Sequence, residues 1–143
     1  MNTQDGIALT GKLTISLNDA IVRETENLVV TAGKEWVTAR MKNTSTVMTH
    51  MAIGTGTVAA AIANTTLGTE LARQALTTSG GTVAGAVITF ATSYAAGTGT
   101  GAITEAGILT AASAGTMLAR TVFGVVNKGT LDTMTISWAV TIS

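Results

Sequence analysis

Side chains that could carry acid–base or nucleophilic chemistry are scarce in this sequence. His50 is the only histidine, and it stands between Met48 and Met51 with no carboxylates at the spacing of a metal site. A Ser or Thr nucleophile needs a positioned base, and His50 is the only usual candidate. We therefore interpret His50 as a packed or interface residue. We predict that the chain is not an enzyme and binds no metal or cofactor.

Two carboxylates could still act as an acid–base pair. Glu24 and Glu26 are two residues apart, which places them on one face of a strand. Arg23 beside them is typical of an ordinary solvated strand. We interpret these charges as surface charges that could contact a partner protein.

Two Gly-Thr-Gly-Thr segments, residues 54–57 and 97–100, could cradle a phosphate if each opened a helix after a strand. Neither completes Gly-x-Gly-x-x-Gly, because Ala59 and Ala102 take the last position. No Gly-Lys-Ser or Gly-Lys-Thr follows either segment. Turn formation is the better interpretation of the glycines at positions Gly54, Gly56, Gly97 and Gly99.

A second phrase is also doubled. Residues 68–73 are Gly-Thr-Glu-Leu-Ala-Arg, and residues 115–120 are Gly-Thr-Met-Leu-Ala-Arg. We expect the two copies at matching corners of two packed sheets, with Arg73 and Arg120 each bridging backbone carbonyls or a carboxylate such as Glu70 or Glu105. The alternative is chance similarity in a chain rich in Thr, Ala and Gly.

The composition favours a protein that associates with copies of itself. Eight basic and eight acidic residues cancel, only 11% of residues are charged, and 29 of the 143 residues are Thr. Basic residues are scattered and aromatic residues amount to 3%, which argues against nucleic-acid binding. No apolar stretch is long enough to predict a membrane span. Between Arg73 and Arg120 the only charge is Glu105, so we expect much of this segment to be covered by a partner, most simply another copy.

The elements that would position these residues are mostly strands. Alternating apolar residues predict a strand over residues 7–17, a turn at Asn18 and Asp19, and a return strand to residue 30. Residues 31–43 are the one good helix candidate, with Thr31 as its cap and residues 43–46 as its exit loop.

Strand and turn patterns continue to the C-terminus. We expect strands over 47–54, 82–94 and 132–143, a hairpin of 102–111 with 117–126, and turns at 80–81 and 127–129. Residues 70–78 could form a strand or a helical turn. The pattern predicts an all-β fold, a sandwich or jelly-roll-like, with an N-terminal β-hairpin and one short helix. We divide this single domain into an N-terminal hairpin or arm, residues 1–30, and a β-sandwich, residues 31–143.

An ordered set of phrases resembles virion structural proteins of tailed bacteriophages. The phrases are ENLVVTAGKEWVTARM, MAIGTGT with LGTELAR, AAGTGTGAITEAGIL, GTMLARTVF and the closing TMTISWAVTIS, so the resemblance runs from about residue 9 to the C-terminus. It implies a small β-rich protein of the phage particle, made in the host cytoplasm, and it carries no catalytic residues.

The expected function is that of a capsid decoration, or cement, protein. The resemblance implies a homo-oligomer, commonly a trimer, that binds the major capsid protein on the outside of the head and stabilises junctions between coat subunits. A tail, neck or adaptor component is the alternative. We expect the charge-poor residues 74–119 to mediate self-association, and the hairpin to contact the coat through Lys12, Arg23, Glu24 and Glu26.

Overall fold

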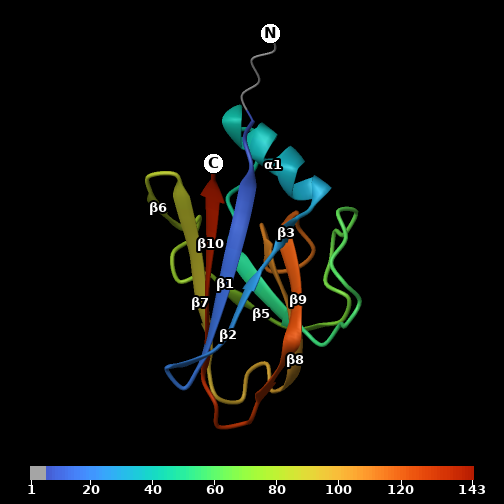
Figure 1. Ribbon diagram of the computed structural model, residues 1–143, viewed down its shortest axis with the longest axis vertical. Helices are drawn as coiled ribbons and strands as arrows, with labels where there is room; N and C mark the ends of the chain where they lie inside the picture. The colour runs from blue at the N-terminus through green and yellow to red at the C-terminus, as the bar shows by residue number, and fades with distance from the viewer. Residues whose placement is uncertain (1–5) are drawn as a thin grey trace.

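Within residues 6–143, two antiparallel sheets of five strands each pack face to face, with one helix at the end of the sandwich (Figure 1). The computed structural model describes residues 6–143. In order across the first sheet lie β2 (Ala20–Glu26), β1 (Leu9–Leu17), β10 (Met134–Ile142), β7 (Val87–Tyr94) and β6 (Thr82–Ala84). Across the second lie β3 (Leu28–Val29), β9 (Met117–Lys128), β8 (Gly101–Leu109), β4 (His50–Gly54) and β5 (Glu70–Ala75). The prediction of an all-β sandwich with one short helix is confirmed.

The N-terminal hairpin forms part of the sandwich. β1 pairs with β2 on one side and with β10 along its whole length on the other. Its inward residues Leu13 and Ile15 are fully buried. The return strand is shorter than expected: β2 ends at Glu26, and the chain then crosses to the second sheet, where β3 pairs with β9. Residues 6–30 therefore contribute to both sheets.

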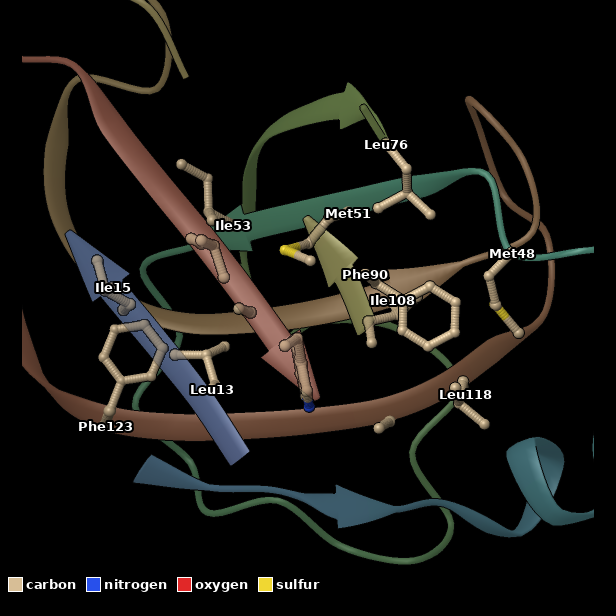
Figure 2. Packing of buried hydrophobic residues seen from close by; sticks show 14 of the residues in the cluster. Leu13, Ile15, Met48, Met51, Ile53, Leu76, Phe90, Ile108, Leu118 and Phe123 are labelled. Atoms are coloured by element: carbon tan, nitrogen blue, oxygen red, sulfur yellow. The ribbon is translucent and has the colours of Figure 1, made fainter. Parts of the chain in front are cut away.

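The core lies between the sheets and draws on both (Figure 2). Period-two alternation puts Met134, Ile136, Trp138 and Val140 of β10 in the core, whereas Ile142 at the strand end is 45% exposed. In Figure 2, Leu13 and Ile15 lie near Phe123 at one end of the core, and Met48, Phe90 and Leu118 lie together at the other. At about 25 cal/mol per Å² of buried apolar surface, these long-range contacts dominate the stability of the fold.

The helix α1 (Thr31–Met41) begins one residue earlier than a Thr31 cap would require. Val30 is the N-cap, and it makes no side-chain capping bond, so the prediction of Thr31 as the cap is wrong. Gly33 explains how the first turn docks, because a Cβ there would lie 2.0 Å from the Leu118 carbonyl oxygen of β9. Packing on β9, more than capping, holds the helix in place. Its exit loop begins at Asn43, as expected, with a φ of 60°.

Two other expectations are corrected. Residues 82–94 form two strands, because Gly85 takes a positive φ of 60° and turns the chain between β6 and β7. The expected turn at residues 127–129 starts late: β9 runs on through Lys128. Of residues 70–78, for which the sequence left strand and helical turn open, Glu70–Ala75 form the strand β5. The β8–β9 hairpin is confirmed.

Candidate functional site

The two arginines of the doubled phrase lie on one rung of one sheet. Arg73 pairs with Ala52, Ala52 with Gly107, and Gly107 with Arg120, across β5, β4, β8 and β9. The expectation of matching corners on two packed sheets is therefore wrong. Ala52 and Gly107, the small residues in the middle of the rung, leave room for the side chain of Leu67. A Cβ on Gly107 would lie 3.0 Å from that side chain. This rung lies on the outer face of the second sheet.

The neighbouring rung carries the two acidic partners. Glu70 pairs with Gly54, and Gly54 pairs with Glu105. Glu70 and Arg73 are three residues apart, a separation that would put them on opposite faces of a regular strand. The register between β4 and β5 shifts at this point, which leaves Leu71 as an extra residue and lets both charges face the same way.

Glu105 and Arg120 form a buried ion pair. Arg120 Nη2 lies 2.7 Å from Glu105 Oε2, and the two side chains are 2% and 0% exposed. Glu105 also accepts hydrogen bonds from the backbone N–H groups of Gly68 and Thr69, at 2.9 and 2.7 Å. Burial opposes ionisation of this carboxyl. The hydrogen bonds from Thr69, Arg120 and Gly68 outweigh it, so the pKa of Glu105 lies below its usual value.

The pair fixes the long loop of residues 55–69 over the outer face of the second sheet. Arg120 donates to the carbonyl oxygen of Val58 at 3.0 Å and to Asn64 Oδ1 at 2.9 Å, with a longer bond to Ala59. At the far side, the N–H of Thr31 donates to the carbonyl of Ile62 at 2.8 Å. Because these carbonyls point inward, the side chains of Val58 and Ile62 stay 78% and 57% exposed. We call residues 58–62 the apolar knob.

The glycines of the two Gly-Thr-Gly-Thr segments are required for different structural reasons. Gly54 and Gly56 lie against the Glu105 carboxylate, and a Cβ on either would come within 2.5 to 2.7 Å of a carboxylate oxygen. Gly97 and Gly99 have positive φ angles of 82° and 65°, and they shape the β7–β8 turn. The turn interpretation describes the second copy. Glycine in the first copy is required by the close approach of Glu105.

Arg73 holds a different segment. It binds Glu70 through two nitrogens, at 2.7 and 3.0 Å, and donates to the carbonyls of Ala111 and Ala114 in the β8–β9 turn. The pair is more exposed than its buried counterpart, with 10% of the Arg73 side chain and 37% of Glu70 accessible. Both arginines thus bridge a carboxylate and backbone carbonyls. Sequence reasoning identified the two carboxylates, but it missed Asn64 and the loop carbonyls because no local pattern marks them.

The charges of the N-terminal hairpin do not all gather. Lys12 lies 3.6 Å from Glu24 on the outer face of the first sheet, and Glu26 is opposite Lys12 in the register. Arg23 is on the inward row, where it packs over Gly124 and donates to the carbonyl of Val125 at 3.2 Å. The structure therefore groups Lys12, Glu24 and Glu26 and directs Arg23 toward the second sheet.

Three other titratable groups, His50, Tyr94 and Lys128, have structural partners. His50 Nδ1 lies 2.7 Å from Thr49 Oγ1. The Tyr94 hydroxyl donates to the carbonyl of Met51, and burial raises its pKa. Lys128, only 2% exposed, donates to the carbonyl of Ala95 at 2.9 Å. Within residues 6–143 no three His, Asp or Glu side chains gather into a metal-binding group.

Two adjoining hollows open at the α1 end of the sandwich. One, of about 250 Å³, has almost wholly apolar walls from α1, β6, β7 and β10, among them Trp36, Val83, Phe90 and Val140. The other, of about 690 Å³, is bounded by Ile7, Met41 and Ile142. The cations at their walls are Arg40 in the first and Lys34 in the second. We call the first hollow the apolar pocket.

Comparison with known proteins yields no relative: no protein-family model, curated protein or solved structure matches the chain. Across residues 6–143 the structure contains no helix long and apolar enough to cross a membrane.

Proposed function

We propose that this chain is a structural protein of a tailed bacteriophage particle, a decoration protein that binds the major capsid protein on the outside of the head. The ordered phrases that resemble phage virion proteins supply the biological assignment. The sandwich fold, with the long loop of residues 55–69 hydrogen-bonded to Glu105 and Arg120 of the second sheet, suits a protein that serves as a fixed spacer or clamp between subunits.

The observation that carries the proposal is the lack of surface charge over residues 74–119. Glu105 is the only charged residue among them, and it is 0% exposed because Arg120 and the loop enclose it. The segment nevertheless has a large exposed surface, including all of β6 and residues 112–116 of the β8–β9 turn. An uncharged surface of this extent favours contact with another protein, and self-association into a ring of copies is the simplest such contact.

The outer face of the first sheet is the proposed coat-binding surface. Its rungs across β1, β10 and β7 carry short side chains: Ser16, Thr135 and Ser93 in one, and Thr14, Ser137 and Ala91 in the next. Lys12 and Glu24 border this face. Short side chains lose little conformational entropy on binding, and the charged border sets orientation. Several copies held together would bind across coat-subunit junctions with avidity and resist expansion of the shell.

The proposed role is non-catalytic. Of the ionisable groups that are buried or half-buried, Glu105, Arg73, Arg120 and Lys128 hold backbone groups of loops and turns. His50 is hydrogen-bonded to its sequence neighbour Thr49. The chemistry of these groups is thus directed at the protein's own main chain.

The copy number of the chain in purified particles of the encoding phage tests the proposal. Quantitative mass spectrometry against the major capsid protein should find it at an abundance comparable to the coat subunit. A handful of copies per particle would place it in the tail or neck. Its absence from particles would contradict a structural role in the virion.

A further inference from the structure

The apolar knob and the apolar pocket match in size and chemistry, and they lie far apart on one chain. The knob, residues 58–62, is on the loop that covers the outer face of the second sheet. The pocket is beneath the C-terminal half of α1, beside the β6–β7 edge of the first sheet. In Figure 1 the loop, in green, and β6 are on opposite sides of the molecule. A single partner copy therefore cannot fill the pocket and receive the knob at once.

We propose that the knob of one copy inserts into the pocket of the next, which gives a head-to-tail interface. The inference deepens the self-association that the proposed function requires, and it names the two surfaces. Because the surfaces differ, the contact is heterologous, and repetition closes a ring or extends a filament.

The volumes are compatible. A cavity of about 150 Å³ with apolar walls is enough to hold benzene. The pocket, at about 250 Å³, has room for the Ile62 or Val58 side chain. Its rim adds Val83, which is 72% exposed, and Ile142, which is 45% exposed. These apolar side chains would leave water together, which is the main favourable term in association.

The knob is held in its exposed form before any partner arrives. Arg120 binds the carbonyls of Val58 and Ala59, and Thr31 binds that of Ile62, so the loop backbone is fixed at both ends of the knob. The N–H of Ala61 also donates to Asn64 Oδ1 at 2.8 Å. A rigid loop loses little entropy on binding, and this strengthens an otherwise small apolar contact.

Charge is complementary between the two surfaces. Glu26 borders a hollow together with Thr57, Ala59 and Ala60, so it lies beside the knob. Lys34 and Arg40 line the two hollows on the receiving side, where no acidic side chain does. Head-to-tail contact would bring the carboxylate toward the two cations, whereas contact between two knobs would bring together like charges.

A complementation experiment tests the interface. Ile62→Asp places a charge on the knob and leaves the pocket intact, and Val83→Asp does the reverse. We expect each variant alone to self-associate at least tenfold more weakly than the unmodified chain in sedimentation equilibrium. An equimolar mixture should form dimers, because one intact knob can still enter one intact pocket, and should form nothing larger.

Controls separate this result from misfolding and from the broader proposal. Leu131→Asp, at a site 88% exposed, should self-associate like the unmodified chain. All variants should keep the unmodified thermal unfolding profile. A mixture that stays monomeric, or single variants that associate normally, would overturn the interface. If the chain decorates particles but fails the complementation experiment, the head-to-tail interface is refuted and the proposed function stands. If the complementation experiment succeeds but the chain is absent from particles, the interface stands and the proposed function is refuted.

Discussion

The two glutamate–arginine pairs of the second sheet use the same chemistry at different depths. Glu105 and Arg120 lie under the loop of residues 55–69, almost fully buried, whereas Glu70 and Arg73 lie at the sheet edge with the carboxylate 37% exposed. Each guanidinium binds backbone carbonyls as well as its carboxylate. The comparison shows that the same sequence phrase can hold either a loop or a turn in place. We expect the burial of each ion pair to set how much that pair contributes to the stability of the fold.

The largest expected effect is loss of the buried cation. Arg120→Ala leaves the Glu105 carboxylate buried without its counter-charge, so it should lower the free energy of unfolding by about 3–5 kcal/mol. Arg73→Ala is the matched variant, and it should cost about 1–2 kcal/mol because Glu70 keeps access to water. Urea denaturation of both variants measures the difference. Equal costs would mean that burial does not distinguish the pairs.

Glycine at position 54 should matter nearly as much. A Cβ there would lie 2.2 Å from the Thr69 carbonyl oxygen and 2.5 Å from Glu105, so Gly54→Ala should cost about 3 kcal/mol. Gly97→Ala, in the other Gly-Thr-Gly-Thr copy, has open space around it and strains only a positive φ, at about 1 kcal/mol.

Hydrogen exchange separates these two glycine variants. Gly54→Ala should expose the N–H groups of Gly68 and Thr69, which donate to Glu105, while Gly97→Ala should leave both protected. Protection of these two amides in both variants would refute the role assigned to the first copy.

Replacement of Glu105 by Gln should show its effect through pH. The folded-state pKa of Glu105 is lowered, so its ionisation stabilises the fold above its unfolded-state pKa of about 4.3. That stabilisation is lost as the pH falls through the lower folded-state value. Glu105→Gln should therefore lower the free energy of unfolding by about 2 kcal/mol at pH 7. The difference in this free energy between the variant and the unmodified chain should become smaller below about pH 4.

Denaturation at pH 7 and pH 3 checks this expectation. Asp132, whose pKa is lowered mainly by its hydrogen bond from Asn18, contributes to acid destabilisation in both proteins, so its effect cancels in the comparison. A gap that stays constant with pH would mean that the Glu105 charge does not stabilise the fold.

The smallest effect on stability is expected at the exposed pair. Lys12 and Glu24 are 3.6 Å apart with side chains 63% and 51% exposed, so Lys12→Ala should change the free energy of unfolding by less than about 0.5 kcal/mol. If these charges border the coat-binding surface, Lys12→Ala should also weaken co-sedimentation with capsids, with this small effect on the unfolding curve. If that variant binds capsids normally, the hairpin charges do not take part in the proposed coat-binding surface.

Local patterns were enough to predict the strands that bury one face. β1 and β10 alternate apolar and polar residues, and since successive side chains of a strand point to opposite faces, the rows of Leu13, Ile15, Ile136 and Trp138 followed directly. The β8–β9 hairpin was equally accessible, because strands joined by a short connection pair with each other. These features depend on residues close together in the chain.

The placement of the two arginines was decided only by the tertiary structure. The rung that joins Arg73 to Arg120 needs β5, β4, β8 and β9 in that order, and the extra residue at Leu71 turns Glu70 to the same face. Glu105 meets Gly68 and Thr69 across more than 35 residues, and Arg120 meets Val58 across 62. Strand order and loop closure result from the burial of apolar surface by the whole chain, so no short stretch of sequence encodes them.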